Sequence, residues 1–186
     1  ENASKLRENA SLGDFFKIKL HDVGILDLIF KKLFLRYPWN NFWHNVVFDL
    51  IQQLLSGRMN GNFNAFLVAD LFNKSRLIDL ILVSHKRNLN FLKKNNIEFA
   101  YMGHISLISE EVNKFTLENN LALIDPNILD LACRQDWFSY INKKLNETKK
   151  SYNLLLGGEK PEAEIYRDPG SIILGSSEEE IENQDI

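Results

Sequence analysis

The chain has 186 residues, of which 45% are hydrophobic and 11% aromatic, and this composition supports one folded domain with its own core. Its formal net charge is −3 and it has no block of basic residues, so a nucleic-acid-binding surface is not expected. The chain has no run of about 18 uncharged apolar residues, so no membrane-spanning helix is predicted. Its N-terminus lacks the pattern of a signal peptide. With Cys133 as its single cysteine, the protein is expected in a reducing compartment, either the cytoplasm or the nucleus.

The first predicted helix follows a polar N-terminal extension, residues 1–13. Glu1 is not an initiator methionine, so we expect the chain to be a fragment of a longer protein. From Asp14 to Leu35, apolar residues recur at helical spacing and cover more than one face of the predicted helix. We therefore expect this helix to be covered on two sides.

The most informative segment runs from Tyr37 to Gly57 and predicts a complete helix with its start and its end. Pro38 disfavours helix at Tyr37, and Asn40 or Asn41 can cap the N-terminus. Gly57 is expected to end the helix in the left-handed conformation. One face of this helix is apolar and is predicted to be buried: Trp43, Val46, Val47, Leu50, Ile51, Leu54 and Leu55.

Helix propensity does not explain the amide side chains of this segment, which are Asn40, Asn41, Asn45, Gln52 and Gln53. Two interpretations stay open. In the first, the amides cap the helix and form an ordinary polar face. In the second, the amides lie beside two tryptophans to make specific hydrogen bonds with the backbone or with a partner.

The rest of the chain predicts further helices, and strand signals are nearly absent. A turn rich in glycine and asparagine covers residues 56–62. Helical spacing follows over residues 63–71 and, after a corner at Asn73 and Lys74, over residues 77–82.

Residues 86–96 are polar and predict either a short helix or a loop. Helical spacing returns over about residues 101–115. Asp125 followed by Pro126 predicts a helix start, with the aspartate as cap and the proline at the first helical position. This last helix is expected to continue to Leu145.

Together these elements predict an all-α protein of stacked helical hairpins, a HEAT- or armadillo-like α-solenoid fragment over residues 14–156. Consecutive helices that are apolar on two faces suit such a stack better than a four-helix bundle. The composition then changes, and residues 157–186 predict a flexible acidic tail. In this tail, Ser176 and Ser177 precede acidic residues and are candidate phosphorylation sites, with a plain solvated tail as the alternative.

Catalysis and metal binding have little support in the sequence. No histidine lies three or four residues from another, as metal-binding helices require; the four are His21, His44, His85 and His104. Neither a nucleophile elbow nor a phosphate-binding loop is present, and Cys133 has no base near it in sequence. We therefore expect a protein that is not an enzyme and holds no metal or cofactor. A hydrolase or metal enzyme that uses His44 and His104 is the alternative.

A second segment of interest is Tyr101-Met-Gly-His-Ile-Ser-Leu-Ile-Ser109. Gly103 lies at the start of the predicted helix, where the missing side chain allows another backbone to approach closely. This predicts either tight packing between two helices or a flat spot where a partner docks.

Three segments of the chain, spread over about residues 15–150, resemble motifs of the SAPS-domain family in the same order. Trp39-Asn-Asn-Phe-Trp-His-Asn-Val-Val is similar to the family's WNNFLHNVV, with the glutamine pair Gln52 and Gln53 following. Tyr101-Met-Gly-His matches the family's YMGH, and the segment from Trp137 to Thr148 resembles its W-x-x-F-x-x-x-x-L-x-E-T-N. The chain departs from the family pattern at a few positions: Trp43, Ala100, Ile105, Ser106 and Lys149.

The resemblance implies a curved stack of helical hairpins that acts as a non-catalytic regulatory or scaffold subunit, in the cytoplasm or nucleus, with a role in the cell cycle. SAPS proteins bind the serine/threonine phosphatase catalytic subunit of the phosphatase 6 or yeast Sit type and direct it to substrates. A generic α-solenoid adaptor for trafficking or transport, without phosphatase binding, is the alternative.

The resemblance also assigns partner-binding or motif roles to two groups of residues: Trp39, Asn40, Asn41, Phe42, His44, Asn45, Gln52 and Gln53, and Tyr101, Met102, Gly103 and His104. Of these, Asn40 and Asn45 are expected to hold the helices together. The roles of Asn41, Gln52 and Gln53 stay open between helix packing and partner contact.

Overall fold

The computed structural model describes residues 11–59 and 63–153, and every regular element in these ranges is helical. The all-α prediction is therefore confirmed for this part of the chain. Most of the predicted N-terminal extension and the whole predicted tail, residues 157–186 with Ser176 and Ser177, lie outside the described residues. The division into three parts stays a prediction.

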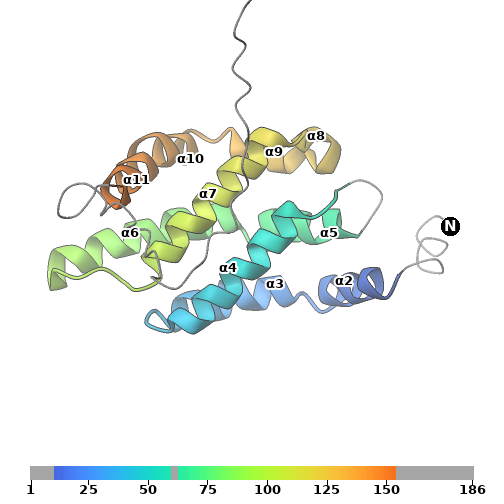
Figure 1. Cartoon of the computed structure of the whole chain (residues 1–186), viewed down its shortest axis with the longest axis horizontal. Coiled ribbons are helices and arrows are strands. Elements are labelled where there is room, and N and C mark those ends of the chain that lie inside the picture. The colour runs from blue at the N-terminus through green and yellow to red at the C-terminus, as the bar shows by residue number, and fades with distance from the viewer. Residues whose placement is uncertain (1–10, 60–62, 154–186) are drawn as a thin grey trace, which may run out of the picture. The chain divides into compact units, whose positions relative to one another are not determined.

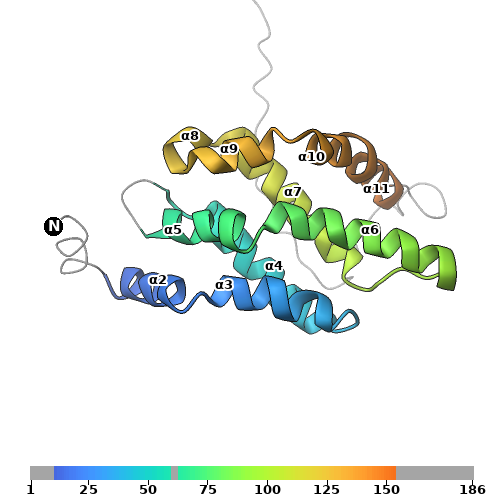
Figure 2. The same cartoon turned by 180° about the vertical axis from the view of Figure 1, so that it is seen from behind.

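The helices form three rows, which Figure 2 shows one above another in blue, green and orange. The first row is α2 (Leu12–Asp22), α3 (Ile25–Asp27), η1 (Leu28–Leu33) and η2 (Phe34–Arg36). The second row is α5 (Asn64–Ala69), η3 (Asp70–Lys74) and α6 (Leu77–Asn95). The third row is α8 (Leu121–Ile124), α9 (Pro126–Ala132), α10 (Gln135–Ser139), η4 (Tyr140–Leu145) and α11 (Asn146–Tyr152).

Two further helices form a second layer against these rows. The first row leads into α4 (Asn41–Ser56), and the second leads into α7 (Met102–Glu118). Figure 1 shows α4 and α7 side by side in front of the rows, and they are in direct contact. The rows touch one another in order, because α2 contacts α5, α3 contacts η3, and η1 contacts α6. Successive helical pairs stacked in this way agree with the solenoid prediction.

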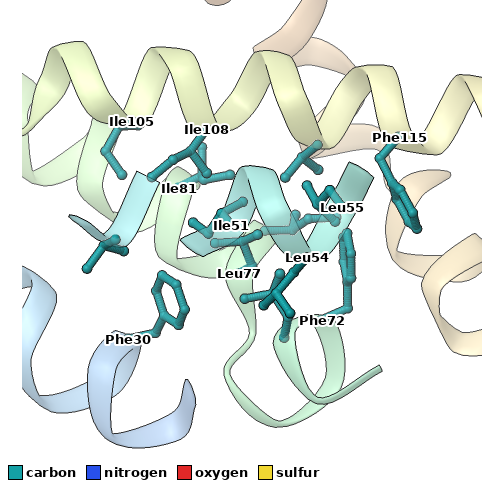
Figure 3. Packing of buried hydrophobic residues seen from close by; sticks show 14 of the residues in the cluster. Phe30, Ile51, Leu54, Leu55, Phe72, Leu77, Ile81, Ile105, Ile108 and Phe115 are labelled. Carbon is teal, nitrogen blue, oxygen red and sulfur yellow. The ribbon is translucent and has the colours of Figure 1, made fainter. Parts of the chain in front are cut away.

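The core lies where α4 and α7 meet the rows (Figure 3). Ile51 of α4, Ile81 of α6 and Ile105 of α7 are fully buried and contribute to one hydrophobic cluster. Removing such side chains from water is the main stabilising term of the fold, at about 1.5–3 kcal/mol per large aliphatic side chain. The apolar face predicted for α4 is only partly right, because Val46 is 44% exposed and His44 is fully buried beside Val47.

The single helix predicted over residues 14–35 is wrong, because the chain breaks at Gly24. Helix α2 begins at Leu12, with Ser11 as its cap, and ends at Asp22. Gly24 then takes a left-handed conformation with φ of +61°, which costs glycine little because it has no Cβ. The break separates α2 from a second helical stretch, formed by α3, η1 and η2, which continues without a gap to Arg36.

The helix predicted from Pro126 to Leu145 is also interrupted. Its start is confirmed, because Asp125 Oδ1 accepts a hydrogen bond from the Asn127 backbone N–H at 2.9 Å. The break comes at Arg134, whose backbone is extended and whose Nη1 donates to Asp79 Oδ1 at 2.6 Å. This ion pair joins the third row to the second, and together with a hydrogen bond from Arg76 it outweighs burial and lowers the pKa of Asp79.

Residues 86–96 are helical almost throughout, which decides the alternative in favour of helix. They form the second half of α6, and Asn96, which follows the last residue of this helix, has a left-handed φ of 55°. Asn88 is 1% exposed and fixes the loop after α6, because its Oδ1 accepts from the Phe99 N–H at 2.9 Å. Its Nδ2 donates to Glu98 Oε1 at 3.1 Å. A buried amide with both ends bonded makes this loop a defined turn.

Gly57 follows the last residue of α4 as predicted, but not in the left-handed conformation, because its backbone is extended with φ −69° and ψ 155°. The reason for a glycine here is space. A Cβ on Gly57 would lie 2.6 Å from Nδ2 of the buried Asn64, and that nitrogen donates to the Leu54 carbonyl at 2.8 Å. Asn64 thus satisfies a carbonyl at the end of α4, and a larger residue at position 57 would push it away.

Candidate partner-binding site

The candidate site is the pair of helices α4 and α7, which contain two of the three family-like segments. Helix α4 starts where the sequence predicts, because Asn40 Oδ1 accepts a hydrogen bond from the Trp43 N–H at 3.0 Å. This cap satisfies one of the free N–H groups of the first turn. Trp39 lies just before it, 55% exposed, with its ring 5.9 Å from that of Phe99 and 6.2 Å from that of Phe91.

Side-chain hydrogen bonds join the outer sides of the two helices. His104 Nε2 donates to Asn45 Oδ1 at 2.7 Å, and Gln52 Nε2 donates to Glu111 Oε1 at 3.0 Å. Both pairs are 59 residues apart in sequence. Since two successive contacts keep the same separation, α4 and α7 run in the same direction and in register, as equivalent helices of neighbouring repeats do.

Below these bonds, His44 is fully buried between the two helices and the first row. Its Nε2 donates to the Phe34 carbonyl at 3.2 Å, and its ring lies 4.8 Å from Phe34, 5.9 Å from Tyr101 and 5.5 Å from His104. Burial lowers the pKa of His44, the bond to Phe34 partly offsets this, and nearby His104 lowers it again. The imidazole is therefore neutral at pH 7 and acts as a core side chain with one hydrogen bond.

The rings of His44 and His104 lie close together, as the metal-enzyme alternative requires, but no third metal ligand lies beside them among the described residues. His104 uses Nε2 on Asn45, and burial lowers its pKa. Within residues 11–59 and 63–153, no group of three His, Cys, Asp or Glu side chains could hold a metal ion.

In the same ranges, no helix is long and apolar enough to cross a membrane.

The remaining candidate residues divide into buried and outward-facing ones. Tyr101 and Met102 are buried in the core, with the Tyr101 ring stacked on Phe99 at 5.1 Å. Asn41 and Gln53 are exposed, and neither side chain makes a hydrogen bond with the part of the chain that the structure describes. Phe42 is 80% exposed in the first turn of α4. These outward side chains are free to meet a partner.

Gly103 does not serve tight helix packing, so that interpretation is wrong. A Cβ built on Gly103 would meet no atom within 4 Å among the described residues, and its φ is not in the left-handed region. The alternative, a flat spot at the start of α7 where a partner docks, stays a prediction. Leu107, one helical turn after Gly103 in α7, is 46% exposed.

Sequence reasoning missed Glu111, whose side chain joins α7 to α4, and Asn64, which holds the end of α4. Asn64 lies in the predicted helical stretch of residues 63–71, and the sequence pattern assigns no role to either residue. The equal separation of Asn45 from His104 and of Gln52 from Glu111 is a signal that could have found Glu111, once a repeat of 59 residues is assumed.

With the site described, comparisons with known proteins give its family. The family model of the SIT4 phosphatase-associated protein, SAPS, matches residues 1–154. The SIT4-associating protein SAP4 of Saccharomyces cerevisiae is 41% identical over 177 residues, which cover 83% of this chain and 22% of that protein. The extragenic suppressor of kinetochore protein 1 of Schizosaccharomyces pombe is 36% identical, over 87% of this chain and 19% of that protein.

A more distant relative is the serine/threonine-protein phosphatase 6 regulatory subunit 3 of Gallus gallus, 29% identical over 80% of this chain and 18% of that protein. The chain thus spans about a fifth of the length of these relatives. No solved structure matches it. The family model matches most of the chain, and α4 and α7 bring two of the motif segments together. The chain therefore belongs to the SAPS family.

Proposed function

We propose that this chain is part of a non-catalytic regulatory subunit that binds a serine/threonine phosphatase catalytic subunit of the SIT4 or phosphatase 6 type and directs it to substrates. The names of the relatives, SIT4-associating protein and phosphatase 6 regulatory subunit 3, support this proposal. The proposed locations are the cytoplasm and the nucleus. The proposed partners include neither a nucleic acid nor a membrane into which the chain inserts.

The observation that carries the proposal is the contact between Asn45 and His104. This contact joins the two family-like segments, which are far apart in sequence, into one surface of two parallel helices. The surface carries an exposed aromatic side chain, Phe42, and exposed amides at Asn41 and Gln53. An aromatic anchor beside unpaired amides suits a specific protein interface. We assign Asn40 and Asn45 to the fold and the outward side chains to the partner.

The test is the affinity of the purified chain for the SIT4-type catalytic subunit, measured by pull-down and biolayer interferometry. Phe42→Ala is expected to weaken binding at least tenfold, because a buried interface aromatic contributes on the order of 2 kcal/mol. The matched control is Phe138→Ala, which removes an equally large side chain, 62% exposed, from α10 on another surface. That control is expected to bind within twofold of the unmodified chain.

Either of two results argues against the assignment. If the unmodified chain captures no catalytic subunit while the full-length relative does, these helices are not sufficient for the interaction. If Phe42→Ala and Phe138→Ala lose the same affinity, the α4–α7 surface is not the docking site. Thermal unfolding of both variants should match that of the unmodified chain, since each replaced ring is largely in solvent.

A further inference from the structure

Basic residues are concentrated where the first two rows turn into α4 and α7. Residues 28–48 contain three basic residues, Lys31, Lys32 and Arg36, and no aspartate or glutamate. Residues 83–101 contain four basic residues and one acidic one: Lys86, Arg87, Lys93, Lys94 and Glu98. The whole chain has a net charge of −3, so these segments depart strongly from the average. Their charge is a local feature of the fold.

The structure brings these two segments together. Arg87 Nη1 donates to the Leu35 carbonyl at 3.4 Å, which fixes α6 against η2. The Arg87 guanidinium lies 5.2 Å from the centre of the Phe99 ring, and Trp39 contacts the same ring. The Arg36 guanidinium lies 5.8 Å from the centre of the Tyr37 ring.

We call this surface the basic–aromatic edge and define it by Lys32, Arg36, Tyr37, Trp39, Arg87 and Lys94. All six side chains are exposed. Lys32 lies one turn before Arg36, and Lys94 lies one turn after Phe91, whose ring contacts Trp39.

The cations of this edge are largely unneutralised. Lys31, next to the edge, pairs with Asp27 at 2.6 Å. Glu98 accepts a hydrogen bond from the neutral amide of Asn88, so it keeps its negative charge and is the one acidic side chain of the second segment. Within the two described stretches of the chain, Lys32, Arg36 and Lys94 form no ion pair. Several like charges held together by the fold repel one another and raise the local positive potential. A negatively charged partner would relieve that repulsion.

We propose that the basic–aromatic edge binds an acidic segment of a partner protein, rich in Glu and Asp and carrying an apolar side chain. The exposed faces of Trp39 and Tyr37 would take the apolar side chain, and the lysines and arginines would pair with the carboxylates. Arginine and aromatic residues together are the usual composition of strong protein contacts. This inference does not depend on the identity of the phosphatase.

A peptide suits the edge better than a nucleic acid does. Nucleic-acid binding draws on many phosphate contacts along an extended basic track. Here the basic surface is short, and α7, which begins just beyond it, carries Glu110, Glu111 and Glu118. A long polyanion would meet this acidic helix, whereas a short acidic segment fits within the edge.

The test is fluorescence anisotropy of the full chain with a labelled dodecapeptide, (Glu-Glu-Ile)4, at low salt. We expect saturable binding that weakens as salt is added. The triple variant Lys32→Glu, Arg36→Glu, Lys94→Glu should lose more than tenfold in affinity. The matched control, Arg58→Glu, Lys143→Glu, Lys150→Glu, makes the same change of charge at exposed positions elsewhere and should change affinity less than twofold. A single variant, Trp39→Ala, should weaken binding without a change of charge.

Other probes separate the alternatives. The peptide (Gln-Gln-Ile)4 keeps the apolar residues without the charge, and it should not bind. If both triple variants weaken binding equally, the effect is general electrostatics and the proposal fails. It also fails if a dT12 oligonucleotide or phosphatidylserine vesicles bind as tightly as the acidic peptide, or if the peptide does not bind. Circular dichroism checks that both triple variants keep the fold.

Discussion

Replacing Tyr101 by alanine is expected to lower the free energy of unfolding by about 4 kcal/mol, the largest effect of any substitution in the candidate site. The side chain is fully buried, and its ring lies 5.1 Å from Phe99, 6.0 Å from Phe34 and 5.9 Å from His44. Truncation would leave a cavity at the point where α7 begins, between the end of the first row and the loop that follows the second row. Urea denaturation at pH 7, followed by circular dichroism, measures the change.

The matched substitution Tyr101→Phe separates the ring from the hydroxyl. Burial raises the pKa of Tyr101, partly offset by Arg87, and the hydroxyl has no hydrogen-bond partner in the described part of the chain. Removing an unsatisfied buried hydroxyl should leave stability unchanged or increase it by up to about 1 kcal/mol. A loss above about 2 kcal/mol for Tyr101→Phe would mean that the hydroxyl has a partner, and would overturn this account of the junction.

We expect the free energy of unfolding to fall as the pH is lowered from about 7.5 to about 5.5. Burial lowers the pKa of His44, His85 and His104 in the folded state, so the unfolded chain binds protons more readily. Their stabilising contribution is complete above the unfolded pKa of about 6.5 and is lost as the pH falls below it. For one proton, the slope reaches about 1.4 kcal/mol per pH unit.

His44→Leu tests which residue is responsible. His44 is fully buried, and the titratable groups facing its ring are His104 and Tyr101, neither of which supplies a negative charge at these pH values. The variant should therefore show a shallower slope between pH 7.5 and 5.5, whatever its absolute stability. If the two slopes coincide, His44 binds protons equally well in the folded and the unfolded chain, and its burial does not govern the acid response.

Local signals explain what could be predicted from the sequence. The cap at Asn40 and the start at Asp125 and Pro126 depend on side chains within three residues of the helix they begin, so the pattern contains all the information needed. The all-α fold follows from hydrophobic spacing for the same reason.

Tertiary contacts explain what could not be predicted. Arg134 interrupts a helical pattern, and its guanidinium bonds both to the nearby Asp136 and to Asp79, 55 residues away. Gly57 is needed by the position of Asn64 and not by its own backbone. Gly24 carries no sign in the local pattern that it breaks the helix, since glycine is also tolerated within helices. Asp79 and Asn64 act across the fold, so the helical patterns around Arg134 and Gly57 do not contain them.

The candidate site was predicted as two separate segments, and the fold shows how they relate. The amides do not act as a group: Asn40 caps α4, Asn45 and Gln52 bond to α7, and Asn41 and Gln53 face outward. Only the last two remain free for a partner among the described contacts. Spacing on one helix could not distinguish these roles, because they depend on where the neighbouring repeat lies.

The central claim is that the outer face of α4 and α7 meets a phosphatase catalytic subunit. Hydroxyl-radical footprinting of the chain, alone and with the SIT4-type catalytic subunit, tests it most directly, because Phe42 and Phe138 are both exposed and serve as internal controls for each other. The account predicts that oxidation of Phe42 falls severalfold in the complex while that of Phe138 is unchanged. Protection of Phe138 with Phe42 still fully oxidised would contradict it.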